Sequence, residues 1–269
     1  MNYYFKAPIL LFFLFVFSNC EKVVDIDLSS GEKKIVVDGF ISNQKGPYIV
    51  QLSRSVNYTN TFKDSKEFEE NAEVIIKDDL GNLEVLKEVS PGVYSTDTFG
   101  LQGIIGRYYS LEIKTFDGQE FESNPELLKS PPLLDSVYYI PGVEIEEDGQ
   151  KSDVWYCDFQ EPQEKNEAYI FRYFFNHKYD GFIITKDKYF NGQLVKKFRI
   201  VGIMGGWSGE PFRMEILTVS EEAYQFWAKI GEFKDAGKPY DLPPAPLFGN
   251  VHRKGNKNDY AFGYFRFPG

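Results

Sequence analysis

Short runs in which apolar and polar residues alternate recur through residues 34–123, and turn residues separate one run from the next. Alternation of this kind places the apolar side chains on one face of a β-strand, because successive residues in a strand point to opposite faces of the sheet. Short runs at regular spacing are typical of an antiparallel sandwich. We therefore predict a small β-sandwich of immunoglobulin or transthyretin type over residues 34–131.

The expected strands of this domain are 35–41, 48–53, 72–77, 83–86, 93–94, 106–113 and 119–123. Residues 54–71 are polar and charged with scattered aromatic side chains, which predicts a long loop. The acidic cluster at residues 78–82 lies between two alternating runs, and this position favours a hairpin turn over a cation-binding loop. Gly100, Gly103 and Gly106 do not form a phosphate loop, because no helix follows them.

Ser130-Pro131-Pro132 marks the predicted boundary to a second β-rich domain at residues 132–269, since consecutive prolines stiffen the chain and interrupt ladder hydrogen bonds. The expected strands of this second domain are 134–140, 154–159, 168–175, 181–184, 212–219 and 259–265. We predict a hairpin turn at Asn191-Gly192, between runs 188–190 and 194–195. Residues 250–258 are predicted to form a polar turn.

One short helix is expected at about residues 220–231 of an otherwise mainly β fold. Ser220 is a suitable N-cap, because its hydroxyl can accept a hydrogen bond from a free N–H of the first turn. Glu221 and Glu222 occupy that first turn, where the helix dipole favours negative charge.

The first twenty residues have the pattern of a lipoprotein signal. Lys6 precedes an apolar run at residues 8–17, and Ser18 and Asn19 precede Cys20. A membrane-spanning helix needs about 20 apolar residues, so this run indicates a cleaved signal peptide. We predict a signal peptide at residues 1–19, lipidation of Cys20 and a tether at residues 20–33. A plain signal peptide with an incidental cysteine is the alternative.

The composition argues against several classes of function. The formal net charge is −10, which disfavours nucleic-acid binding through a basic surface. Cys157 lies in an alternating run and is predicted to be a small core residue. His177 and His252 have no neighbouring Asp or Ser in a triad pattern, and no zinc-ligand spacing is present. We therefore expect no catalytic residues, no metal ligands and no cofactor, and predict that the protein is not an enzyme.

Aromatic residues make up 17% of the chain, and several lie in expected loops. The candidate ligand-stacking residues are Tyr58, Phe62, Tyr179 and Trp207. Trp227 lies on the apolar face of the expected helix and is better explained by core packing. Ser136, within Asp135-Ser136-Val137, fits an acidic-hydroxyl-apolar pattern of O-glycosylation.

A series of short motifs follows in order along almost the whole chain. These are CEKVVDIDL at 20–28, IVVDG at 35–39, VQLSRS at 50–55, AEV at 72–74, GVY at 92–94, GRYYSL at 106–111, LDSV at 134–137, EAYQFW at 222–227, GNV at 249–251 and GYF at 263–265. With this ordered set, the sequence resembles the DUF4249 family of Bacteroidota envelope lipoproteins. The resemblance implies no established catalytic residues and a frequent genetic association with TonB-dependent outer-membrane receptors. Many relatives are expected to continue beyond the last motif, which leaves a missing C-terminal segment open.

Together with Cys20, the resemblance implies a lipoprotein of the outer membrane that acts as a non-catalytic accessory or binding partner of a TonB-dependent receptor in nutrient uptake. A free-standing structural or adhesive surface lipoprotein is the alternative. Co-purification of a β-barrel receptor favours the first interpretation, and binding to host or matrix proteins without one favours the second. The sequence does not identify the ligand, the oligomeric state, or which face of the outer membrane the protein occupies, periplasmic or extracellular.

Overall fold

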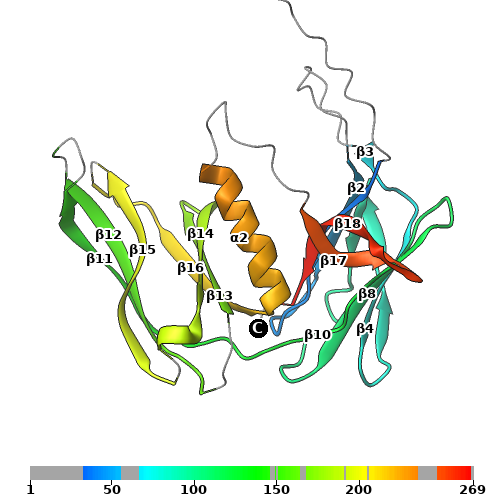
Figure 1. The fold of residues 1–269 in the computed structure, drawn as a ribbon, viewed down its shortest axis with the longest axis horizontal. Helices are drawn as coiled ribbons and strands as arrows, with labels where there is room; N and C mark the ends of the chain where they lie inside the picture. The colour runs from blue at the N-terminus through cyan, green and yellow to red at the C-terminus, as the bar shows by residue number, and fades with distance from the viewer. Residues whose placement is uncertain are drawn as a thin grey trace, which may run out of the picture. The chain divides into compact units, whose positions relative to one another are not determined.

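β-strands dominate the computed structural model of the chain (Figure 1). The structure describes residues 33–55, 67–145, 149, 151–163, 168–190, 192–204, 206–235 and 247–267. The predicted fold class, mainly β with one helix beginning near residue 220, is confirmed for this part of the chain. Cys20, Tyr58 and Phe62 lie outside the described residues.

The largest sheet has twelve strands. They are β1 (Ile35–Phe40), β2 (Ile49–Arg54), β3 (Glu67–Phe68), β4 (Glu73–Asp78), β5 (Leu83–Val85), β6 (Lys87–Ser90), β7 (Val93–Ser95), β8 (Tyr108–Lys114), β9 (Glu120–Ser123), β10 (Glu126–Leu127), β17 (Phe248–Arg253) and β18 (Asn256–Arg266). The order is β5-β4-β8-β9-β17-β18-β1-β2-β7-β6, with β3 beside β2 and β10 beside β8. Since β5 and β6 follow each other in the chain but lie at opposite ends of this order, the sheet nearly closes into a barrel-like sandwich.

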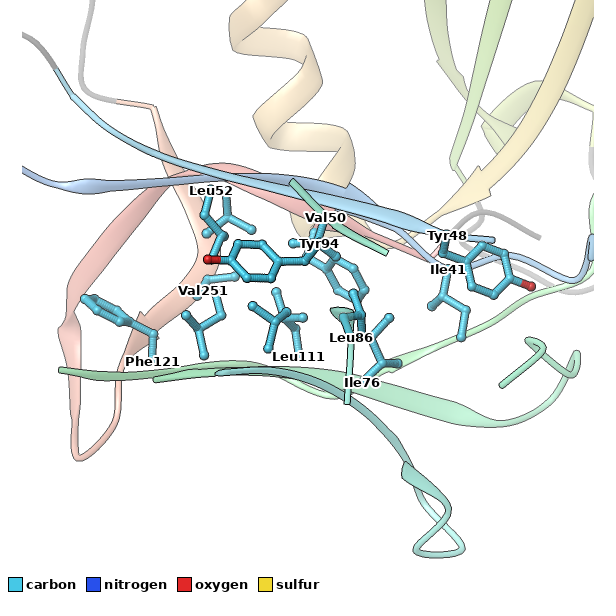
Figure 2. Packing of buried hydrophobic residues seen from close by; sticks show 14 of the residues in the cluster. Ile41, Tyr48, Val50, Leu52, Ile76, Leu86, Tyr94, Leu111, Phe121 and Val251 are labelled. Carbon is cyan, nitrogen blue, oxygen red and sulfur yellow. The ribbon is translucent and has the colours of Figure 1, made fainter. Parts of the chain in front are cut away.

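The core of this sheet lies between its two walls. Figure 2 shows Val50 and Leu52 of β2 on one wall and Ile76 and Leu111, from β4 and β8, on the other. All four side chains are fully buried, and each such burial stabilises the fold by about 1.5–3 kcal/mol. The alternation predicted from the sequence therefore corresponds to the inward and outward faces of these strands.

The last two strands complete the large sheet. β18 pairs in parallel with β1, and β17 pairs with both β18 and β9. The predicted polar turn at residues 250–258 is therefore wrong, because only the residues around Gly255 turn. The division at residues 131 and 132 stays a prediction, although β17 and β18 come from the range assigned to the second domain and lie in the sheet formed mostly by the first.

Two three-stranded sheets contain the other six described strands. One has the order β11 (Leu133–Ile145), β12 (Lys151–Gln160), β15 (Leu194–Met204), and the other β14 (Lys178–Lys186), β13 (Ala168–Phe175), β16 (Phe212–Val219). Buried side chains from both sheets form one hydrophobic cluster. For example, the ring centroids of Phe159 on β12 and Phe171 on β13 are 5.4 Å apart. The two sheets therefore share an aromatic core.

Asn191 lies outside the described residues, but the predicted hairpin pairing of residues 188–190 with residues 194–195 is wrong. Residues Asp187–Tyr189 form a short 3-10 helix, η1, and β15 pairs with β12. A two-residue turn with positive φ instead joins β13 to β14, where φ is 47° at Asn176 and 63° at His177. Asparagine tolerates this backbone conformation better than most residues, so Asn176 is the residue in this part of the sequence that indicates a turn.

Helix α2 (Glu221–Asp235) begins where the sequence predicts and ends later. The Ser220 hydroxyl accepts a hydrogen bond from the Ala223 N–H at 3.1 Å, which confirms the N-cap. The helix continues past Gly231, because an interior glycine costs only about 1 kcal/mol relative to alanine. Ala223 and Phe226 belong to a buried cluster that also contains Ile170 of β13 and Tyr264 of β18.

Candidate functional site

Two of the predicted stacking residues lie among the described residues. Tyr179 is 47% exposed on β14, and its ring contacts Phe174 and the Arg172 guanidinium, with centroid distances of 5.8 and 5.6 Å. These contacts leave one part of the ring open to solvent. Ligand binding by Tyr179 stays a prediction.

Trp207 packs into an aromatic group. Its ring centroid lies 4.7 Å from that of Tyr139 and 5.2 Å from that of Trp155, and its indole N–H donates to the Glu210 carbonyl oxygen at 3.1 Å. Trp207 and Tyr179 thus have different aromatic neighbours among the described residues. Trp227 packs against Phe182 at 5.1 Å, as expected of a core residue.

The described residues contain no group of three or more His, Cys, Asp or Glu side chains arranged to hold a metal ion. Cys157 is buried, as predicted. His252 is also buried, and its ring nitrogens lie 3.3 Å from the Asn124 side-chain oxygen and from the Arg253 carbonyl oxygen. None of the described helices is long and apolar enough to cross a bilayer.

The most distinctive surface feature is the segment at residues 97–107, which we call the distal loop. It carries Phe99, Ile104 and Ile105, whose side chains are 94%, 57% and 44% exposed. Leu80, in the β4–β5 turn, is also exposed. The Arg107 guanidinium forms ion pairs with Asp78 and Asp79, which connects the loop to that turn. Several exposed apolar side chains thus project from one end of the large sheet.

A carboxylate holds the tip of the distal loop. Glu84 on β5 accepts hydrogen bonds from the backbone N–H groups of Asp97 and Leu101, at 2.6 and 2.5 Å. Within the loop, the Asp97 side chain accepts a hydrogen bond from the Phe99 N–H at 3.1 Å, and its carbonyl oxygen accepts one from the Gly100 N–H. The backbone is therefore held by hydrogen bonds both before and after Phe99 in the chain.

Further hydrogen bonds fix the rest of the loop to the sheet. The Gly103 N–H donates to the Ser42 carbonyl oxygen at 3.1 Å, and the Ile104 N–H donates to the hydroxyl of buried Tyr109 at 2.8 Å. The Gly106 N–H donates to the Leu128 carbonyl oxygen. Loops without such bonds sample many conformations, so this one is unusually well held for an exposed segment.

The three glycines explain why the loop lies so close to the sheet. A Cβ atom at Gly100 would collide with the Glu84 carboxylate, and one at Gly103 would collide with the Ser42 carbonyl. Gly106 has a φ of 87°, which glycine adopts without strain. The spacing of these glycines does not form a phosphate loop, because no helix follows it. Read as a requirement for close backbone packing, it would have pointed to this loop.

The distal loop lies at the end of β1 farther from Lys33. Lys33 precedes β1 and forms an ion pair with Glu67, whereas Ser42, which anchors Gly103, follows it. A strand of six residues spans about 20 Å at about 3.3 Å per residue. The loop is therefore separated by the length of a strand from the point where the described chain begins.

An open groove of about 440 Å³ lies at the end near Lys33. Its lining includes Phe68, Phe116 and the ion pair of Arg54 with Glu69, in which Arg54 Nε lies 2.5 Å from the carboxylate. The Arg54 guanidinium also approaches Asp117 at 3.8 Å. The best-buried charged groups of this groove, Arg54 and Glu69, are therefore paired with each other.

The fold and these surfaces define a mainly β protein with an exposed apolar loop. The model of the family described as "Domain of unknown function (DUF4249)" matches residues 21–267, so the chain belongs to this family. No curated protein matches the chain at a level that indicates kinship.

Proposed function

We propose that this protein is an outer-membrane lipoprotein of Bacteroidota type, anchored through Cys20, that acts as a non-catalytic accessory or binding partner of a TonB-dependent receptor in nutrient uptake. The observation that carries the proposal is the distal loop, in which exposed Phe99 lies on a backbone fixed by Glu84. Exposed apolar side chains gain free energy when a partner covers them. A fixed loop loses little conformational entropy on binding.

The anchor is supported by the signal pattern before Cys20. One acyl chain gives only marginal membrane binding, whereas two or more chains hold a protein stably at the bilayer. A lipid-anchored protein can bind a receptor with only modest intrinsic affinity, because anchoring both in the same membrane raises their local concentration.

The proposal is tested by extracting the tagged, full-length protein from its native membrane in a gentle detergent and identifying what co-purifies. We expect one TonB-dependent receptor in near-equal amount, and loss of membrane attachment in Cys20→Ser. Recovery of the lipoprotein alone would contradict the proposal and would favour a free-standing structural or adhesive surface protein.

A further inference from the structure

We propose that Phe99 inserts into an apolar pocket on the surface of a partner protein, and that Glu84 is the positioning residue of this docking surface. The inference rests on the proposed function and names the residues through which the partner is bound. Large aromatic side chains near the centre of an interface commonly contribute most of its binding energy. Phe99, at 94% exposed, has nearly its whole ring available for such a contact.

The geometry around Phe99 supports a preformed contact. Glu84 accepts hydrogen bonds from the N–H groups two residues before and two residues after Phe99. The intervening Phe99 N–H is bonded to the Asp97 side chain. The direction in which the loop tip projects is thus set before a partner arrives, so little free energy is lost in ordering the loop on binding.

The neighbouring apolar residues extend the surface. Ile104 and Ile105 are exposed on the same loop, and Leu80 is connected to it through the ion pairs of Arg107 with Asp78 and Asp79. Near-neutral contacts around a central anchor exclude water from it. We therefore expect Ile104 and Leu80 to form the rim around Phe99.

The charges favour a protein partner over a lipid surface. Loops that enter anionic bilayers combine apolar side chains with cations that face the headgroups. Two cations beside the loop lie within ion-pair distance of aspartates, Lys87 with Asp97 and Arg107 with Asp78 and Asp79, and a third, Lys45, is exposed nearby. The chain as a whole has a net charge of −10. An anionic membrane would repel it.

Phe116 provides a matched control within the same sheet. It is an exposed phenylalanine, at 80%, in the turn between β8 and β9. It lines the groove near Lys33, at the end of the sheet opposite the distal loop. Substitutions at positions 99 and 116 therefore remove the same side chain from two exposed sites, only one of which belongs to the proposed docking surface.

The test places a photo-activated phenylalanine analogue at position 99, or at 116, in the full-length lipidated protein within its native membrane. We expect position 99 to form a covalent crosslink to the receptor that co-purifies with the wild-type chain, and position 116 to give at least about tenfold less. Glu84→Ala is expected to lower the yield from position 99 severalfold, and Glu84→Gln, which keeps one acceptor oxygen, to lower it less. Thermal unfolding of each variant shows whether a loss comes from misfolding.

The outcomes separate this inference from the proposed function. Receptor co-purification with equal crosslinking at both positions would overturn the docking surface and leave the proposed function standing. Crosslinking from position 99 only to phospholipid, or only to a second copy of this chain, would also overturn it. A Glu84-dependent crosslink to one identified protein other than a receptor would keep the docking surface and overturn the proposed function.

Discussion

Glu84 and Glu126 each accept hydrogen bonds from more than one donor, but their surroundings differ. Glu84 is partly exposed and holds backbone N–H groups of the distal loop. Glu126 is buried, and its carboxylate accepts hydrogen bonds from the Tyr264 hydroxyl at 2.6 Å and the Asn250 amide at 3.0 Å. Burial raises the pKa of Glu126, and hydrogen bonds from Tyr264, Ser220 and Asn250 offset only part of that effect.

This raised pKa predicts how stability depends on pH. The ordinary pKa of the carboxyl is 4.5. A carboxyl whose pKa is raised in the folded state contributes stability that is fully present below 4.5 and is lost as the pH rises through the folded pKa. The free energy of unfolding of the wild-type chain minus that of Glu126→Gln should therefore fall above pH 4.5, by at most about 1.4 kcal/mol per pH unit. Urea unfolding at several pH values measures this difference, and an increase with pH would contradict the account.

Cys157 gives a second prediction for a single residue. Its side chain is buried in the aromatic core between β12 and β13, and burial raises the pKa of its thiol to about 12. The thiolate is the reactive form, so the folded protein should not react with a thiol reagent at pH 8. In a Cys20→Ser background, where Cys157 is the only cysteine, rapid labelling without denaturant would show that the core is more open than described.

At the scale of elements, β18 depends on a close approach to β1. Gly263 on β18 and Gly255 in the β17–β18 turn have nearly the same backbone conformation, with φ of 80° and 79°. A Cβ atom at Gly263 would collide with the Val37 carbonyl oxygen, whereas one at Gly255 would meet no atom. Alanine at either position would strain the backbone equally, but only alanine at position 263 would also collide with a neighbouring strand.

We expect Gly255→Ala to destabilise the chain by about 1–2 kcal/mol, the cost of a left-handed conformation for a residue with a side chain. Gly263→Ala should cost at least about 2 kcal/mol more, because the two strands must also move apart. Urea unfolding of both variants measures the difference. Equal losses would mean that β18 does not lie against β1 as described.

Local patterns predicted most strands but not how they pair. The burial alternation in β8 is unbroken, and both β8 and β16 were predicted within one or two residues of their observed ends. β17 was missed because Asn250 and His252 look like loop residues. Both are buried, and Asn250 bonds to Glu126 and to the backbone of Phe265, so tertiary contacts satisfy polar groups that sequence alone assigns to solvent.

At the scale of the whole molecule, the first and last described strands lie side by side. β1 and β18 pair in parallel near the middle of the large sheet. The proposed docking surface depends on the same long-range arrangement, because Glu84, Ser42 and Tyr109 hold the distal loop from three separate parts of the chain. The exposure of Phe99 could not be predicted from local periodicity, because it follows from those long-range contacts.

The most direct test of the proposed docking compares receptor recovery by wild-type, Phe99→Ala and Phe116→Ala proteins, each extracted from its native membrane in gentle detergent. A central aromatic anchor commonly contributes about 2 kcal/mol, or about 30-fold in affinity. We therefore predict near-equal recovery of one TonB-dependent receptor with the wild-type and Phe116→Ala proteins, and severe loss with Phe99→Ala. The account would be contradicted if Phe99→Ala retained the receptor as well as Phe116→Ala does, or if the wild-type protein recovered none.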